Sequence, residues 1–305
     1  MNSTSDVAIT DGEQIVMKWI SVFLGLIGAI SNTYTIVCIA RYRYLRSKVT
    51  NILIGNLCMC GVLLAVTPVI SVFNWSGKAN ISSGFIASVI VAALYMSLLI
   101  ILLIGVDRMI AVADPIGYKI RMTQKKTGLA LVIMWISCMA FSMGFMMSTT
   151  NQTFLRNTTI YKVSLPLFTA VIVFAVIAIY VGILIEFTRR QKRAKLQFSG
   201  QFFPAIRRSR YLTKMTLFIL IIFLATWLPT MIVTVRGPPA EGSSEATFET
   251  HRWASHITNA ILHASAFTNC LVYAFTNPEY RKAYRDLLRC TRGCLWHYYA
   301  RRNGA

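Results

Sequence analysis

Residues 79–106, ANISSGFIASVIVAALYMSLLIILLIGV, contain no charged side chain. A helix needs about 20 predominantly apolar residues to cross the hydrocarbon core of a bilayer, so this run is long enough to span a membrane. An open strand would leave its backbone polar groups without hydrogen-bond partners in lipid, which favours a helix. The stretch therefore predicts a transmembrane helix and raises the question of how many more the chain contains.

Further charge-free runs of similar length occupy most of the remaining chain. They are residues 19–40, 49–77, 127–155, 163–185, 215–235 and 253–278. The composition agrees: 55% of the 305 residues are hydrophobic, 14% are charged and the mean hydropathy is +0.56, which is too apolar for a soluble globular domain. We expect an all-α membrane protein with a seven-transmembrane helix bundle over residues 17–276, preceded by an N-terminal tail at residues 1–16. The polar start of the chain gives no sign of a cleavable signal peptide.

The distribution of basic residues predicts the orientation. Most of the 31 lysines and arginines lie in residues 41–48, 108–126, 187–214 and 281–302. Because positively charged loops stay in the cytoplasm, we expect an extracellular N-terminus and a cytoplasmic C-terminus. The Asn-x-Ser/Thr triplets that accept N-glycosylation fall on the predicted outer side; they begin at Asn2, Asn74, Asn80, Asn151 and Asn157.

The net charge of +20 follows from this topology. Its basic excess lies on the predicted cytoplasmic side, where it faces the anionic inner leaflet and cytosolic partners. Nucleic acid is the alternative partner for so basic a chain, but a polytopic membrane protein argues against it. All 7 cysteines lie in predicted spans or on the cytoplasmic side, so we expect no extracellular disulfide.

Residues 107–118, DRMIAVADPIGY, follow the opening stretch and begin with an acid–base pair. Asp107 and Arg108 have two interpretations: a solvated helix end, or a switch in which the arginine is bound in one state and released in another. Adjacent helix positions do not face each other squarely, so a competitor can share this pairing. Other polar residues inside the spans either form interhelical hydrogen bonds, worth about 0.6 kcal/mol each, or mark a functional site; they are Asn32, Asn56, Asn259, His263 and Asn269.

Taken in order along residues 15–292, these positions resemble the rhodopsin-like (class A) G-protein-coupled receptors. The matching residues are Asn32, Asn56-Leu57, Asp107-Arg108-Met109 with Tyr118, Trp135, Tyr180 with Ile183, Phe223 with Trp227 and Pro229, and Asn269 with Tyr273, where Cys270 replaces the family's proline. The resemblance implies that the switch and G-protein-coupling site consists of Asp107, Arg108, Tyr180, Trp227, Pro229, Asn269 and Tyr273.

A second Asn-Pro pair, Asn277-Pro278, follows the seventh charge-free run. Proline is favoured in a first helical turn and asparagine suits the cap. The apolar residues that follow recur at helical spacing; they are Tyr280, Ala283, Tyr284, Leu287 and Leu288. We expect a short amphipathic eighth helix over residues 277–290 on the inner leaflet, then a cytoplasmic tail at 291–305. Cys290 and Cys294 are either palmitoylated or free thiols.

Two departures from the family pattern affect the interior and the branch. Gly61 stands where the family has the aspartate that anchors a sodium pocket, which argues against that pocket; Ser97, Ser265 and Asn269 would line a polar pocket there. The family's extracellular disulfide is also missing. In that loss and in its short second outer loop, the chain resembles the melanocortin, cannabinoid, adenosine and lysophospholipid branch of the family.

The resemblance also places a ligand pocket, which is mostly apolar with a few neutral polar groups. Its members are Ile90, Val91, Leu94, Tyr95, Ser164, Phe168, Trp227, Thr230, Met231, Thr234, Asn259 and His263. Ile90 stands where amine receptors carry an aspartate, and the seventh run lacks the lysine that binds retinal in opsins. A small neutral or lipid-like ligand therefore fits better than an amine or retinal.

The resemblance implies a multi-pass plasma-membrane receptor that couples an extracellular ligand to a heterotrimeric G protein. The alternative is a receptor-like protein that no longer couples and acts as a scaffold or decoy. An enzyme is disfavoured because no catalytic constellation is present. His256 and His263 are two helical turns apart, about 10.5 Å along the axis and too far for one metal ion, so we expect no metal or cofactor.

Overall fold

The computed structural model describes residues 3–69, 81–114, 117–150, 158–197, 217–218, 220–230, 232–233, 236, 239–240 and 242–303. Its labelled helices are α1 (Ser3–Arg41), α2 (Arg43–Arg46), α3 (Val49–Ala65), α5 (Ile81–Ala113), α6 (Tyr118–Arg121), α7 (Gln124–Thr150), α8 (Thr158–Gln197), α10 (Glu245–Thr276) and α11 (Pro278–Asn303). A short helix, Leu220–Thr230, lies between α8 and α10 in the chain.

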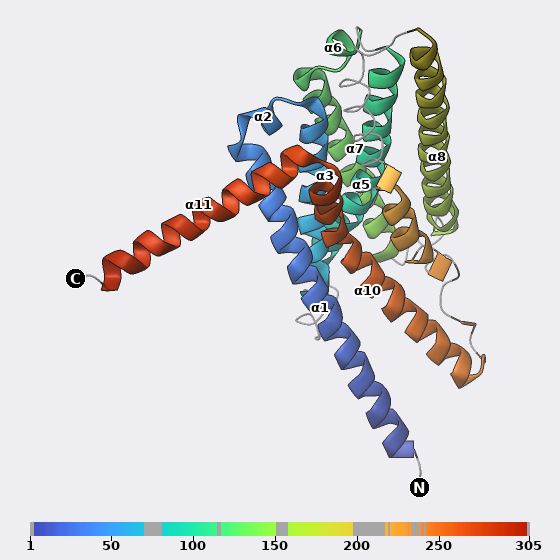
Figure 1. Ribbon diagram of the computed structural model, residues 1–305. Coiled ribbons are helices and arrows are strands. Elements are labelled where there is room, and N and C mark those ends of the chain that lie inside the picture. Colours follow the sequence, from blue (N-terminus) through green and yellow to red (C-terminus); the bar gives the residue numbers. More distant parts are fainter. Residues whose placement is uncertain are drawn as a thin grey trace.

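Long helices cross the molecule and form one bundle (Figure 1). In the described part, the helices long and apolar enough to span a membrane are Ile15–Arg41, Val49–Val69, Ser88–Ala113 and Gln124–Gly144. The fifth and sixth predicted spans appear there as shorter apolar helices, Ala170–Glu186 and Leu220–Thr230. α10 contains most of the seventh span. The predicted fold, an all-α seven-transmembrane membrane protein, is confirmed.

α5 is the central helix of the bundle. It packs against α3, α7 and α8, whereas α1 packs against α3 and α10. The buried side of α5 is mostly apolar; it includes Ala92, Ala93, Met96, Ile100, Ile101 and Ile104. Large apolar side chains on the outer helices are exposed instead, including Ile30 and Phe174. Apolar side chains thus occupy both the interior and the outer surface. A bundle that faces lipid requires this, because lipid tails cover its outer surface.

Two glycines set the close approach of α5 and α8. A Cβ at Gly105 would lie 2.9 Å from the ring of Tyr180, and one at Gly182 would lie 2.5 Å from the methyl group of Met109. Each helix thus offers a glycine to a large side chain of the other, which lets the backbones approach. The arrangement places the Tyr180 ring one turn before Arg108 along α5.

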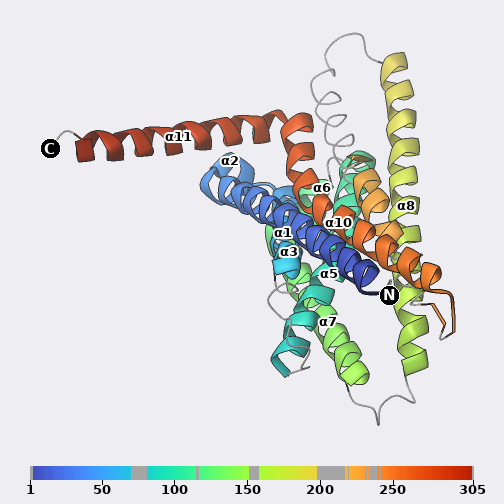
Figure 2. The ribbon, with the colours of Figure 1, turned by 90° about the horizontal axis from the view of Figure 1, so that it is seen from below.

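The chain turns sharply between α10 and α11. α10 ends at Thr276, and Asn277 Oδ1 accepts a hydrogen bond of 3.0 Å from the backbone N–H of Glu279. Pro278 is the first residue of α11, so the expected cap and first turn are both present. α11 then extends away from the bundle (Figures 1 and 2).

Both ends of the chain are more helical than the sequence suggested. α11 continues to Asn303, past residue 290, because no proline follows Pro278 to interrupt it. α1 begins at Ser3, within the segment expected to be a tail. The apolar face of α11 also differs from expectation: Tyr280, Ala283 and Leu287 are buried in the protein core, while Leu288 is half exposed. The bundle itself therefore covers much of the face predicted to lie on lipid.

Candidate functional site

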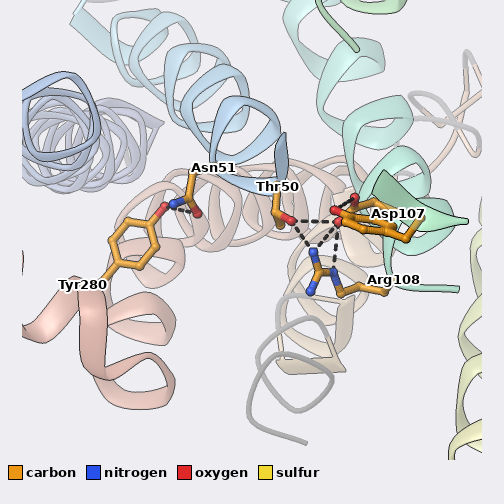
Figure 3. Close-up of polar contacts among 6 residues, drawn as sticks. Thr50, Asn51, Asp107, Arg108 and Tyr280 are labelled. Carbon is orange, nitrogen blue, oxygen red and sulfur yellow. Dashed lines mark hydrogen bonds and ion pairs between the residues drawn. The ribbon is translucent and has the colours of Figure 1, made fainter. Parts of the chain in front are cut away.

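Asp107 and Arg108 lie near the end of α5, next to Thr50 in the first turn of α3 (Figure 3). Arg108 Nε donates to Asp107 Oδ2 over 3.0 Å, and Nη2 contacts the same oxygen. Asp107 is 0% and Arg108 7% exposed. A buried ion pair is stable only when additional hydrogen bonds satisfy its remaining polar atoms, so its neighbours decide how firmly the arginine is bound.

Thr50 and Tyr118 complete the coordination of this pair. Thr50 Oγ1 donates to Asp107 Oδ2 over 2.8 Å and accepts a hydrogen bond from Arg108 Nη2. Tyr118 donates to Asp107 Oδ1 over 2.7 Å. Burial, reinforced by the Asp107 carboxylate, raises the pKa of Tyr118 to about 12, so the phenol remains a proton donor at neutral pH. Thr50 is thus the competitor that shares the Asp107–Arg108 pairing.

The next residue, Asn51, connects the same turn of α3 to α11. Its Nδ2 donates to the Leu45 carbonyl over 2.8 Å, and its Oδ1 accepts 3.0 Å from the Tyr280 hydroxyl (Figure 3). Lys48 and Glu279 form an ion pair at the same junction. Successive helix positions point about 100° apart, so Thr50 contacts α5 while Asn51 contacts α11.

The remaining predicted switch residues lie deeper in the bundle. Tyr180 and Tyr273 are both buried. The Tyr273 ring lies 5.3 Å from that of Tyr280, and its hydroxyl has no hydrogen-bond partner among the described residues. An unsatisfied buried hydroxyl costs about 1–3 kcal/mol. The Tyr273 hydroxyl is therefore unsatisfied among the described residues, whereas Asp107 and Arg108 bond directly to each other.

A cavity of about 40 Å³ lies in the middle of the bundle. It is lined by Leu57, Gly61, Leu64, Leu94, Ser97, Phe223, Trp227, Leu262, His263, Ser265, Ala266 and Asn269. The polar residues expected there, Ser97, Ser265 and Asn269, are all present, together with three predicted ligand residues, Leu94, Trp227 and His263. Trp227 stacks on Phe223, with ring centroids 5.8 Å apart. This volume has room for a few water molecules.

Gly61 and Asn32 fit together beside this cavity. A Cβ at Gly61 would lie 2.8 Å from Asn32 Nδ2 and 2.9 Å from its Cγ. The Asn32 amide donates to the carbonyls of Gly28 and Ala266, over 2.8 and 2.7 Å, and so joins α1 to α10. Asn32 therefore occupies the space that a side chain at position 61 would need. The sequence showed the missing aspartate but not what fills its place.

The other predicted ligand residues are more dispersed. Tyr95 and Phe168 form an aromatic group with Phe141, with ring centroids 5.7 to 5.8 Å apart. Thr230 donates to the Thr258 carbonyl over 3.1 Å. Asn259 is exposed, whereas Ile90 and Val91 are partly buried.

Several predicted positions carry no structural description. Met231, Thr234 and the glycosylation residues Asn2, Asn74, Asn80, Asn151 and Asn157 lie outside the described residues. Ser164 and Cys294 lie in α8 and α11, and their side chains are outside the described part. Cys290 is exposed and lies 3.8 Å from Arg41 Nη2.

Three residues of the site and one of the aromatic group are not among those predicted from the sequence. Thr50 and Asn51 follow the basic segment 41–48 at the start of a span, and a hydroxyl and an amide at membrane depth were the available signal. From the sequence, Tyr280 is predicted only as part of an apolar helix face. Phe141 gave no signal, because an aromatic residue in an apolar run is ordinary.

Known proteins resemble this chain over nearly its whole length. Residues 31–273 match the family described as 7 transmembrane receptor (rhodopsin family). The chain is 25% identical to the histamine H2 receptor of Cavia porcellus, covering 91% of this chain and 80% of that receptor. It is 23% identical to the D(1A) dopamine receptor of Xenopus laevis, over 95% and 76%, and 20% identical to galanin receptor 2a of Danio rerio, over 91% and 79%.

The fold and the paired Asp107–Arg108 site define a heptahelical membrane receptor, and the family match covers most of the chain. This chain belongs to the rhodopsin family of seven-transmembrane receptors, as its motifs indicated. The narrower resemblance to the melanocortin, cannabinoid, adenosine and lysophospholipid branch is not supported by these relatives.

Proposed function

We propose that this receptor transmits the binding of an extracellular ligand to a heterotrimeric G protein, with Arg108 at the coupling site. The observation that carries the proposal is the buried network of Asp107, Arg108, Thr50 and Tyr118. A buried cation bound through exchangeable hydrogen bonds can be transferred to another acceptor when the helices repack. A ligand must bind the repacked state better in order to favour it.

The proposed orientation puts this network at the cytoplasmic face of a plasma-membrane protein. Basic segments converge there: Lys48 contacts Glu279, and Gln124 donates to the Ser47 carbonyl over 2.9 Å. Clustered lysine and arginine favour the cytoplasmic side, so the glycosylation triplets would face outward.

The proposed movement begins at the central cavity. Pro229 lies in the Leu220–Thr230 helix, where a proline removes one backbone hydrogen bond and permits a bend. Trp227 is buried two residues earlier and lines the cavity. A ligand that shifts Trp227 would swing the other end of this helix and free Arg108 for Tyr180, Tyr273 and the G protein.

We propose a small neutral or lipid-like ligand. The lining of the cavity is mainly apolar, and its polar groups are two hydroxyls, one amide, the indole N–H of Trp227 and His263. Two relatives are named for the amines histamine and dopamine. Ile90 offers no carboxylate to such a cation, so family membership at 20–25% identity does not carry their ligands to this chain.

A receptor-like scaffold or decoy that does not couple is the alternative, favoured by Gly61 and by Cys270 at the family's proline position. Basal G-protein activation in cells separates the two. In the described residues Arg108 pairs with Asp107 alone among the acids, so we expect measurable basal signalling that Arg108→Ala abolishes at equal surface expression. Arg121→Ala, which removes an exposed pair with Asp114, is the matched control. Basal signalling equal to that of mock-transfected cells would count against the coupled receptor.

A further inference from the structure

The Cys270 thiol lies in the interface of α1 and α10, where it contacts two polar residues of α1. Thr35 Oγ1 donates to Cys270 Sγ over 3.2 Å, and Cys270 Sγ donates to Asn32 Oδ1 over 3.7 Å. Cys270 is 7% exposed and both partners are 0% exposed; the Cys58 thiol of α3 is a further neighbour. Proline, the family's residue at this position, has neither an S–H nor a backbone N–H. The cysteine therefore adds a donor and an acceptor to this interface.

A chain of hydrogen bonds extends from this thiol to α11. Thr35 Oγ1 lies 2.8 Å from the Tyr284 hydroxyl. The single proton of the Thr35 hydroxyl goes either to Cys270 or to the Ser31 carbonyl, 3.0 Å away, so in both cases the Tyr284 hydroxyl is the donor to Thr35. When Thr35 donates to the thiol, protons are donated in one direction, in the order Tyr284, Thr35, Cys270 and Asn32. Hydrogen bonds in such a chain strengthen one another.

α11 is held at two points that lie one helical turn apart. Tyr284 is bound to α1 through its hydroxyl and also through its carbonyl, which accepts a hydrogen bond of 2.8 Å from the Tyr34 hydroxyl. Tyr280 donates to Asn51 of α3 over 3.0 Å, and its ring lies 6.0 Å from that of Tyr284. The residue before Asn51 is Thr50, which bonds to the ion pair of the coupling site. A displacement of α11 therefore acts on the turn of α3 that holds this pair.

We propose that Cys270 is a positioning residue, which holds α11 in place and thereby keeps the Thr50 hydroxyl on the Asp107–Arg108 pair. Alanine at position 270 would leave Asn32 Oδ1 without this donor. It would also remove a bond between α1 and the last two turns of α10, after which α11 begins. The effect on signalling rests on the proposed function, whereas the anchoring of α11 does not.

Backbone hydrogen exchange of the full-length receptor in phosphatidylcholine nanodiscs tests the anchoring. We expect Cys270→Ala to raise the exchange of the amides of residues 280–288 about fivefold, the equivalent of one hydrogen bond. Cys270→Ser should stay near the wild-type rate, because serine keeps a donor and an acceptor at this site. Cys138→Ala is the matched control, since it removes a buried thiol of α7 outside the chain. Equal exchange in Cys270→Ala and in this control would overturn the inference.

A double-mutant cycle tests whether Cys270 and Tyr284 act through one chain. Tyr284→Phe removes only the hydroxyl, so its combination with Cys270→Ala should lower the melting temperature by less than the sum of the single variants. Its combination with Cys138→Ala should lower the melting temperature by that sum, because the two sites share no partner. Additive shifts in both combinations would show that no chain links Cys270 to α11.

Basal signalling separates this inference from the proposed function. We expect Cys270→Ala to raise the Arg108-dependent basal signal about twofold, because the resting state loses part of a hydrogen-bond network, and Cys270→Ser to leave it at the wild-type level. Wild-type signalling equal to that of mock-transfected cells, with the expected exchange result, would contradict the proposed function alone. An Arg108-dependent signal with unchanged exchange in Cys270→Ala would contradict this inference alone.

Discussion

The Arg108 end of the bundle and its central cavity contain polar groups that are satisfied in different ways. At the Arg108 end the hydrogen bonds cross between helices: Thr50 of α3 meets Asp107 of α5, and Asn51 meets Tyr280 of α11. Around the cavity the serines bond within their own helix, Ser97 to the Ala93 carbonyl and Ser265 to the Leu262 carbonyl.

The two regions therefore differ in which hydrogen bonds must change when the helices move. Cross-helix bonds must break when the helices repack, so they define a discrete resting state. Bonds within one helix survive the same movement, so the cavity walls can shift at little cost in hydrogen bonding. One cross-helix bond near the cavity, from Asn32 to the Ala266 carbonyl, joins α1 to α10 and is expected to hold those two helices together in both states.

The largest expected effect is the removal of the charge at Asp107. Asp107→Asn leaves Arg108 buried without its counter-ion, and breaking a buried pair costs about 3 kcal/mol or more. We expect a clearly lower melting temperature of the purified receptor and higher basal signalling, because the resting state loses most stability. Asp114→Asn, in an exposed pair, should change neither. An unaltered melting temperature in Asp107→Asn would show that the pair is not what stabilises this end.

A smaller effect is expected from filling the space beside Asn32. Gly61→Ala places a methyl group against the Asn32 amide, and overpacking of this kind costs about 1–3 kcal/mol. Gly55→Ala on the same helix has its nearest neighbour at 3.8 Å, and it should be neutral or slightly stabilising because glycine is a poor helix former. Thermal unfolding of both variants measures the contrast. Equal melting temperatures would mean that Asn32 moves away freely and that the α1–α10 bond is weak.

The smallest effect is expected from removing the Thr50 hydroxyl, which bonds to both Asp107 and Arg108. Thr50→Val keeps the shape but removes a bond worth about 1 kcal/mol, which should raise basal signalling by a few fold. Thr226→Val is the control, since the Thr226 hydroxyl donates only to carbonyls of its own helix, at 2.8 and 3.1 Å. If both substitutions act alike, cross-helix bonding at the Arg108 end has no special role.

The sequence predicted most of the fold because lipid imposes a simple rule. Charge-free runs longer than a bilayer core have to be helices, and their number gave the bundle. The boundary between α10 and α11 at Asn277-Pro278 could also be predicted, because a helix cap and a first-turn proline act within a few residues. Helix ends without such signals, at Ser3 and Asn303, were not anticipated, since nothing local stops a helix there.

The site could be predicted only in part. Asp107 and Arg108 are neighbours in the chain, so their pairing needed no knowledge of packing. Thr50 is 57 residues from Asp107 and Asn51 is 229 from Tyr280, and no local rule connects such positions. The fit of Gly61 to Asn32 likewise depends on the relative rotation of α1 and α3.

By itself the sequence determined the membrane class of this protein, its helical spans, its acid–base pair and its family, because hydrophobic length, charge and motif spacing are local properties. The tertiary structure decided which helix provides the partner of each buried polar group, where a glycine permits close approach, and which residues bond to the Cys270 thiol. These depend on the register and rotation of packed helices, which hydropathy does not encode because the outward and inward sides of the described helices are both mostly apolar.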